Sequence, residues 1–269
     1  MSDKVFLLGL GNQKCGTTWV HNYLEESPNF DGGFKKEYHI WDALDVPVKR
    51  GSRVSVPKAI RGSHSQRRRF LMQRVTQYYF NYFALRFRDG VTVTADITPS
   101  YSGLEKERLR FIRDGFAVRG ITVRPIIFIR EPVSRIKSAV RYILDRNKHK
   151  QGFDLVGGDF RGALKQYYQS EHCRVRTNYA PAIEAATAVF GEECLYIGVF
   201  ESMFERTESE RMSDFMNVPL KPELSRKSVN KTRGTPENDP DLELAVKEAY
   251  RHVYDYCFER CPQTQELWM

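Results

Sequence analysis

Short apolar runs rich in β-branched residues alternate along the chain with longer segments of helical periodicity. The apolar runs are residues 5–11, 91–97, 123–129 and 195–200. The helical segments are residues 17–26, 65–87, 103–117, 131–148, 160–190 and 241–260. This alternation predicts an α/β fold in which a mainly parallel sheet is flanked by helices on both faces. Residues 126–129 are apolar at every position, as expected of a strand that is buried on both sides.

Length and composition place the chain among ordinary globular proteins. Of its 269 residues, 41% are hydrophobic and 28% are charged. This length allows one large α/β domain or two small ones. No apolar run approaches the roughly 20 residues of a membrane-spanning helix, and residues 5–11 are too short a run for a secretory signal. We therefore expect a cytoplasmic protein without membrane contacts.

The net charge of +8 favours an anionic partner, but it does not distinguish nucleotides from nucleic acids, acidic glycans or membranes. The densest basic run, Arg67 to Arg69, falls in a segment of helical periodicity. We interpret it as the solvated face of a helix and only secondarily as a binding patch for a polyanion. No dedicated nucleic-acid-binding motif is present.

The five cysteines are scattered and lack the spacing of a metal site. Cys257 and Cys261 would share one face of the last helix, where we interpret them as small buried hydrophobes rather than a disulfide.

A glycine-containing turn follows the first apolar run and leads into a helical segment. In this context, backbone N–H groups and a helix N-terminus face an anion. Gly11 and Gly16 have the spacing of the P-loop pattern G-x-x-x-x-G-K-[ST], but Thr17 stands at the lysine position. Because a triphosphate would lose its main β/γ contact there, this P-loop-like turn argues against an ordinary kinase or ATPase.

The turn instead resembles the 5′-phosphosulfate-binding loop of sulfotransferases that use 3′-phosphoadenosine-5′-phosphosulfate (PAPS). The residues that carry the resemblance are Gln13, Lys14, Cys15, Gly16, Thr17, Thr18 and Trp19. In that family the loop lysine lies beside the oxygen that bridges the 5′-phosphate and the sulfuryl group. The resemblance implies that residues 13–18 bind the donor and that Lys14 stabilises the leaving group.

A second anion site is expected because PAPS carries another phosphate on its ribose. Arg130 follows the strand at 126–129, Pro132 opens the next helix, and Ser138 lies about two turns along it. These positions resemble the family's 3′-phosphate-binding motif, which implies that Arg130 and Ser138 bind the 3′-phosphate. Arginine suits this role because a guanidinium group recognises phosphate through paired N–H donors.

Residues 225–241 are rich in Pro, Asn, Gly and charge, which predicts a long loop of the kind that is often functional. Within it, residues 229–234 resemble the late N-K-T-[KR]-G stretch of heparan-sulfate sulfotransferases, which closes over the 3′-phosphate and adenine. On that basis alone, Lys231, Arg233 and Gly234 are expected to bind the donor. In those enzymes a cysteine-bridged hairpin follows, whereas residues 235–238 contain no cysteine.

An acceptor needs a base that removes its proton. Residues 35–42 resemble the K-E-x-H-F-F-D segment of the heparan-sulfate type, in which the glutamate is the base, and Glu37, His39 and Asp42 match it. If residues 36–40 are extended, the side chains of Glu37 and His39 point the same way. We assign Glu37 as the general base and His39 as a partner that orients or binds the acceptor.

Residues 93–102 are similar to the family's strand followed by T-P-x-Y, but Ile97 stands where many glycan-type members carry a lysine. Two interpretations of Asp96 stay open, since it either binds acceptor hydroxyls or caps the strand end. Tyr101 either lines the acceptor pocket or belongs to the core.

The resemblance runs in separate blocks from residue 5 to residue 234 and favours one sulfotransferase domain over residues 1–269. It implies sulfuryl transfer from PAPS to a hydroxyl, or less favourably an amine, of a carbohydrate or small molecule. The product would be 3′-phosphoadenosine 5′-phosphate (PAP), and no metal would be required. Two other functions stay open: a P-loop nucleotide kinase-like enzyme in which Asp96 serves Mg²⁺, and a basic polyanion-binding module acting through Arg67 to Arg69. Nothing in the sequence indicates an oligomeric state.

Overall fold

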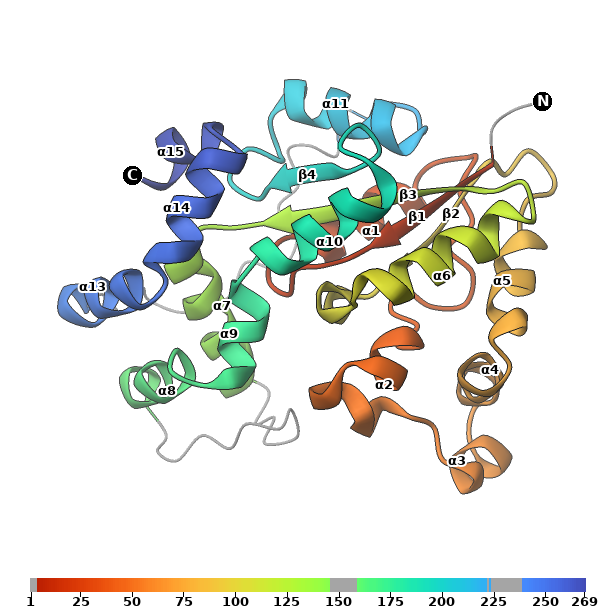
Figure 1. Cartoon of the computed structure of the whole chain (residues 1–269), viewed down its shortest axis with the longest axis horizontal. Helices are drawn as coiled ribbons and strands as arrows, with labels where there is room; N and C mark the ends of the chain where they lie inside the picture. The colour runs from red at the N-terminus through yellow and green to blue at the C-terminus, as the bar shows by residue number, and fades with distance from the viewer. Residues whose placement is uncertain (1–3, 146–158, 222, 224–238) are drawn as a thin grey trace.

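Four parallel strands form the centre of the molecule. The computed structural model describes residues 4–145, 159–221, 223 and 239–269. In these residues the strand order is β2-β1-β3-β4 (Figure 1). The strands are β1 (Val5–Gly9), β2 (Val93–Ile97), β3 (Thr122–Ile129) and β4 (Tyr196–Val199). Each coincides with one of the four predicted apolar runs, with β3 beginning one residue earlier than its run, so the prediction of the sheet is confirmed.

The remaining described elements are helices. They are α1 (Thr17–Glu25), α2 (Trp41–Asp45), α3 (Val56–Arg61), α4 (His64–Arg74), α5 (Thr76–Ala84), α6 (Lys106–Ala117), α7 (Pro132–Asp145), α8 (Phe160–Tyr167), α9 (Glu171–Thr177), α10 (Ala180–Phe190), α11 (Arg206–Met216), α13 (Pro240–Ala249), α14 (Arg251–Arg260) and α15 (Gln263–Trp268), with the 3₁₀ helices η1 (Pro47–Ser52) and η2 (Pro99–Gly103).

Three of the predicted helical segments are interrupted. Residues 65–87 form α4 and α5, which meet at Val75 in a non-helical conformation. Residues 160–190 form α8, α9 and α10, because Ser170 caps the start of α9 and Pro181 occupies the first turn of α10. Residues 241–260 form α13 and α14, which meet at Tyr250. The prediction of continuous helices was wrong at these points, and α11 was not predicted.

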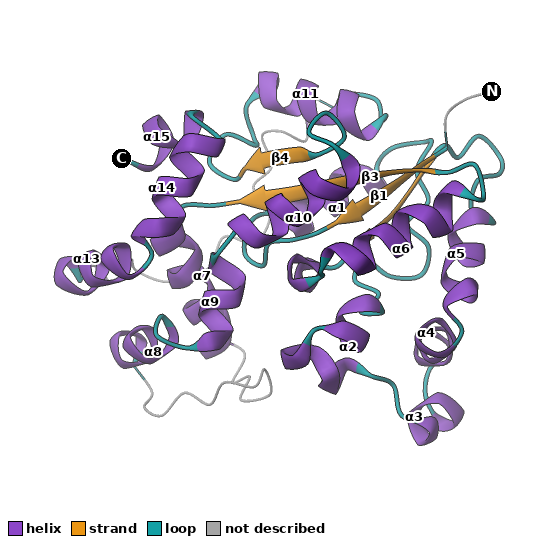
Figure 2. Cartoon of the chain, in the orientation of Figure 1, coloured by secondary structure: helices purple, strands orange, loops and turns teal. Residues whose placement is uncertain are grey.

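Helices cover both faces of the sheet, as predicted. Val5 and Leu7 pack with residues of α1 and α11 on one face. Phe6 and Leu8 pack on the other face with residues of α5, α6, α7 and α10. All four of these β1 side chains are fully buried, as expected of a strand in a parallel sheet with two covered faces. Figure 2 shows the strands enclosed between the helices.

The carboxyl ends of β1 and β3 lie at a topological switch point, because the chain continues from β1 to a strand on one side and from β3 to a strand on the other. The two strands are neighbours, with Gly9 in register with Ile126. After β1 the chain enters α1 on one face, and after β3 it enters α7 on the other. Ligands of open α/β sheets bind at the carboxyl ends of the strands at such a point. Lys14 and Arg130 follow these two strands in the sequence.

Candidate functional site

The loop after β1 is anchored to β3 by backbone hydrogen bonds. The N–H of Asn12 donates to the carbonyl of Phe128 over 3.0 Å, and the N–H of Phe128 donates to the carbonyl of Gly11 over 2.8 Å. Gly16 then begins α1 in the left-handed region with φ 86°. A Cβ at Gly16 would come within 2.6 Å of the Met203 sulfur atom, so both conformation and space require glycine here.

The N-terminus of α1 faces this loop without a side-chain cap. The first N–H groups of a helix have no intrahelical partner and carry partial positive charge, so they suit an anion. Thr17 is buried in this first turn, whereas Thr18 is exposed. This turn therefore has a backbone geometry that suits an anion.

Lys14 and Cys15 point in different directions. The Lys14 ammonium group lies 4.5 Å from the centre of the Tyr142 ring on α7. The Cys15 side chain is fully buried, and this burial raises its pKa to about 12. A neutral, buried thiol contacts no ligand, so Cys15 offers an anion only its backbone.

Arg130 brings the two predicted anion motifs into contact. Its Nη1 donates a hydrogen bond to the Lys14 carbonyl over 3.2 Å, and its guanidinium group lies 4.2 Å from the centre of the Phe200 ring. Its Nε is buried and has no hydrogen-bond partner among the described residues. The loop after β1 and the residue after β3 thus form one continuous site.

The helix after Arg130 begins as the sequence predicted. Glu131 accepts hydrogen bonds from the N–H groups of Val133 over 3.1 Å and Ser134 over 2.6 Å, and Pro132 is the first helical residue of α7. Ser138 is 6% exposed. It lies one turn before Tyr142, whose ring contacts Lys14, and residues four apart share a helix face. Ser138 therefore lies on the same face of α7 as Tyr142.

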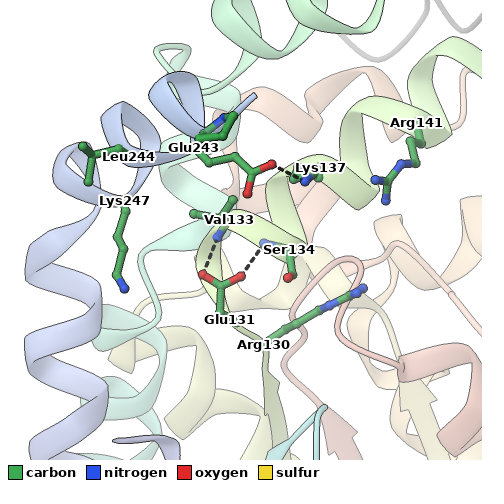
Figure 3. A pocket seen from close by; sticks show the side chains of 10 residues that line it. Arg130, Glu131, Val133, Ser134, Lys137, Arg141, Glu243, Leu244 and Lys247 are labelled. Atoms are coloured by element: carbon green, nitrogen blue, oxygen red, sulfur yellow. Dashed lines mark hydrogen bonds and ion pairs between the residues drawn. The ribbon is translucent and has the colours of Figure 1, made fainter. Parts of the chain in front are cut away.

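A cavity of about 500 Å³ opens beside Arg130, between α7 and α13. Its lining includes Lys137, Arg141 and Lys247, but not Ser138 (Figure 3). Lys137 is paired with Glu243 across the cavity over 2.5 Å. The positive side chains of this lining make it suitable for a phosphate group that approaches Arg130. Sequence reasoning did not identify Lys137, Arg141 or Lys247.

On the acceptor side, His39 lies between two carboxylates. Its Nε2 is 3.3 Å from Oε2 of Glu37, and its Nδ1 is 2.7 Å from Oδ2 of Asp42. The Ser100 hydroxyl also donates to Asp42, over 2.5 Å. The backbone of His39 is left-handed with φ 54°, rather than extended as expected. The side chains of Glu37 and His39 nevertheless lie in contact.

These contacts determine the charges of the group. Burial by itself would raise the pKa of Glu37, but the hydrogen bond from His39 and the charge of Lys36 outweigh it and lower the pKa to about 2. For His39, burial opposes the charged form, whereas hydrogen bonds to Asp42 and Glu37 dominate and raise the pKa. Glu37 is therefore an anion at neutral pH, and His39 keeps its proton to higher pH than an ordinary histidine.

Lys36 connects the two halves of the site and was not identified from the sequence. Its ammonium group lies 3.3 Å from the Thr17 hydroxyl, 3.0 Å from the Thr18 hydroxyl and 3.2 Å from Oε1 of Glu37. The sequence feature that could have identified Lys36 is its position directly before Glu37 in the K-E-x-H segment.

Asp96 does not bind an acceptor, which corrects one of the two interpretations of this residue. Its side chain is fully buried and accepts hydroxyl hydrogen bonds from Thr98 over 2.6 Å, Tyr101 over 2.8 Å and Tyr79 over 3.0 Å. Burial raises its pKa to about 6 in spite of these donors. With its oxygens occupied, Asp96 is unsuited to hold Mg²⁺ for a kinase-like reaction. Tyr101, 1% exposed, belongs to the core.

The basic run on α4 is less solvated than predicted. Arg67 is exposed, but Arg68 lies over the Phe34 ring at 5.6 Å. Arg69 donates to the carbonyl of Ser52 over 3.2 Å. These contacts leave little of a continuous basic face for a polyanion.

The remaining sequence predictions concern the late loop, the cysteines, metal binding and membrane spans. Lys231, Arg233 and Gly234 lie outside the described residues. Cys257 and Cys261 are buried and not joined in a disulfide, as predicted. Among the described residues, no group of three His, Cys, Asp or Glu side chains forms a metal site. None of the described helices is both long enough and apolar enough to cross a membrane.

The fold is similar to that of known sulfotransferases. No protein-family model and no curated protein matches the sequence. The crystal structure of a sulfotransferase from Alicyclobacillus acidocaldarius matches with a TM-score of 0.57 and 20% identity, over 92% of this chain and 91% of that chain. The sulfotransferase domain from the curacin biosynthetic pathway has a TM-score of 0.48 and 16% identity, over 87% of this chain and 81% of its own. The sulfotransferase domain of a Synechococcus olefin synthase has a TM-score of 0.48 and 13% identity, over 93% of this chain and 94% of its own. The first match shows that the chain has the α/β fold of a sulfotransferase, with its P-loop-like turn after β1.

Proposed function

We propose that this protein is a PAPS-dependent sulfotransferase that acts on a hydroxyl of a carbohydrate or small-molecule acceptor. The main support is the hydrogen bond between Arg130 and the Lys14 carbonyl. Two motifs that are 116 residues apart in the sequence meet at this bond, as expected if they bind the 5′ and 3′ anionic groups of one nucleotide. The sulfotransferase fold supports the same function.

The described residues fit such a donor. The uncapped N-terminus of α1, with residues 13–18, would hold the 5′-phosphate. Arg130 and Ser138 would hold the 3′-phosphate, next to the positively lined cavity. When bound, PAPS supplies an activated sulfuryl group whose leaving group is the 5′-phosphate of PAP. Lys231, Arg233 and Gly234 are further candidates for the donor site on the basis of the sequence motif alone.

The acceptor-side residues fit proton removal. Glu37 takes the proton of the acceptor hydroxyl, and the acceptor oxygen forms a bond to sulfur. The bond between sulfur and the bridging oxygen breaks, and its electron pair stays on the 5′-phosphate. Lys14 stabilises the charge that develops there. The products are a sulfate ester, PAP and protonated Glu37, so atoms and charge balance.

Lys36 links the base to the donor. The hydrogen bond from His39 and the charge of Lys36 together make Glu37 a weak base with a pKa of about 2. A donor at the N-terminus of α1 would attract the Lys36 ammonium group from the neighbouring Thr17 and Thr18. Glu37 would then lose part of its stabilisation and become a stronger base. His39 and Asp42 would hold the carboxylate in place.

The proposed class of acceptor follows from the position at which this sequence departs from the heparan-sulfate sulfotransferases. The segment at Glu37 resembles the heparan-sulfate type, but Ile97 replaces the lysine of many glycan enzymes. Ile97 is 1% exposed and contributes only apolar surface. We therefore favour a carbohydrate or small hydroxylated molecule over a heparan-like polymer.

The test is isothermal titration calorimetry of the purified protein with PAP, adenosine 5′-phosphate, and ATP with Mg²⁺. Micromolar binding of PAP that weakens when the 3′-phosphate is absent would support the donor site, and acceptors could then be screened with PAPS. A preference for ATP would instead favour a kinase-like enzyme. If PAP does not bind, and heparin binds with a steep salt dependence, the polyanion-binding module is the better description.

A further inference from the structure

Residues 37–40, which carry Glu37 and His39, belong to no helix or strand. Their backbone N–H groups are instead bound by side chains. The Thr98 hydroxyl accepts hydrogen bonds from the N–H of Tyr38 over 3.0 Å and from that of His39 over 3.4 Å. The Tyr101 hydroxyl accepts from the N–H of Ile40 over 3.2 Å. Oδ1 of Asp96 also accepts directly from the N–H of Tyr38, over 3.4 Å. The acceptor-side loop is thus held by two hydroxyl groups and by the carboxylate between them.

Both hydroxyl groups are oriented by Asp96. Thr98 donates to Asp96 over 2.6 Å, and Tyr101 donates to it over 2.8 Å. A hydroxyl group has one proton, so donation to Asp96 leaves its lone pairs for the loop. A buried anion as acceptor polarises both hydroxyls and strengthens the hydrogen bonds that they accept. Asp96 therefore determines the direction of every hydrogen bond in this network.

The network fixes an unfavourable backbone conformation. His39 has φ 54°, which is uncommon for a residue other than glycine. Such conformations persist where the surrounding structure determines them. The Gln73 side chain supports the same residue by donating to the His39 carbonyl over 2.8 Å. In this conformation the His39 ring lies between Glu37 and Asp42.

We propose that Asp96 is a positioning residue, which acts through Thr98 and Tyr101 and through its own contact with the Tyr38 N–H to hold Glu37 and His39 in their reactive arrangement. The catalytic part of this inference rests on the proposed function, because it assumes that Glu37 is the base. The mechanical part of the inference is that Asp96 fixes the conformation of residues 37–40. This part is independent of any substrate.

Three conservative variants separate positioning from general stabilisation. Thr98→Val and Tyr101→Phe each remove a hydroxyl that joins Asp96 to the loop. Tyr79→Phe is the matched control, because its hydroxyl also donates to Asp96 over 3.0 Å but accepts no backbone N–H of residues 38–41 among the described contacts. Asp96→Asn removes the anion itself. Melting temperatures establish that each variant is folded under the conditions of the measurements.

The first measurement is amide hydrogen exchange of residues 38–41. We expect exchange at least about tenfold faster in Thr98→Val and Tyr101→Phe, and within about twofold of wild type in Tyr79→Phe. Unchanged exchange in the two linking variants, or equal acceleration in the control, would overturn the inference. Because exchange needs no substrate, it decides the mechanical part even if the protein does not use PAPS.

The second measurement is turnover of PAPS with an accepted acceptor, together with PAP affinity. Positioning predicts that kcat falls about tenfold or more in Thr98→Val, Tyr101→Phe and Asp96→Asn, while the Kd for PAP stays within about twofold. A fall in kcat that follows the melting temperature across all variants, including Tyr79→Phe, would contradict a positioning role. Failure of wild type to bind PAP would overturn the proposed function and leave the exchange result intact.

Discussion

The Lys36 ammonium group and the Thr18 hydroxyl lie 3.0 Å apart. A residue next to the proposed base thus contacts the first turn of the helix that is proposed to hold the donor. The same ammonium group lies 3.2 Å from Glu37. Donor and acceptor sides of the site are therefore connected through a single side chain, and substitution of Lys36 tests that connection.

Lys36→Met should reduce turnover by roughly 10²-fold, because a cation beside the reacting group is lost. Lys35→Met is the matched control, since Lys35 is exposed and adjacent in sequence. Steady-state kinetics with PAPS at saturating acceptor would measure both variants. Equal turnover of the Lys36 and Lys35 variants would show that Lys36 has only a structural role.

Glu37→Gln should lower kcat by roughly 10²- to 10⁴-fold, the range of a general base. PAP affinity should stay within about twofold, because Glu37 is proposed to act on the acceptor only. Calorimetry and steady-state kinetics on the same preparation separate the two effects. An active Glu37→Gln variant beside an inactive His39→Ala variant would identify His39 as the base.

Arg130→Lys should weaken PAP binding by roughly 10- to 100-fold, which corresponds to a charge-assisted hydrogen bond of about 1.5 to 3 kcal/mol. Lysine keeps the charge but loses the paired N–H donors. Binding of adenosine 5′-phosphate, which lacks the 3′-phosphate, should change little. Arg110→Ala serves as the control, because Arg110 is half exposed on α6 and pairs with Glu107. PAP affinity equal to wild type in Arg130→Lys would refute the 3′-phosphate assignment.

His39→Gln should change how stability depends on pH. The pKa of His39 is raised in the folded protein by hydrogen bonds to Asp42 and Glu37 that overcome its burial. Its contribution to stability is therefore fully present below the ordinary histidine pKa of about 6.5 and is lost as pH rises through the higher folded value. Urea unfolding should be measured between about pH 6 and pH 9. The free energy of unfolding of the wild type should fall with rising pH by more than that of the His39→Gln variant.

The control for this measurement is His64→Gln, since His64 is exposed at the start of α4. Its pH profile should match that of wild type. If His39→Gln also follows the wild-type profile, His39 is not charged between the two carboxylates.

The strands and the donor side of the site were predictable because both follow from local pattern. Apolar runs that are buried on two faces identify strands directly. Once β1 and β3 are neighbours, the residues that follow them must lie at one edge of the sheet. The contact of Arg130 with Lys14 is thus a consequence of topology. The interruptions at Val75 and Tyr250 were less predictable, because neither residue is a strong helix breaker.

The acceptor side was less predictable because its arrangement depends on hydrogen bonds between distant residues. Asp96 on β2 bonds to Tyr79, which is 17 residues away and lies on α5. No periodicity indicates that a carboxylate at a strand end will be enclosed by hydroxyl groups. The left-handed conformation of His39 is likewise a product of its surroundings. Lys231, Arg233 and Gly234 stay predictions of the motif alone.

The two loops of the site are attached to the protein by different kinds of bond, and this has an evolutionary consequence. Backbone groups of Gly11, Asn12 and Phe128 hold the donor loop, with one further hydrogen bond from the Asn12 side chain to the Phe128 carbonyl, so most of its attachment does not depend on side chains. Hydroxyl groups of Thr98 and Tyr101 hold the acceptor loop, and a single substitution removes either of them. Under the proposed function, descendants of such a protein would therefore acquire new acceptors by few mutations while they continue to use the same donor.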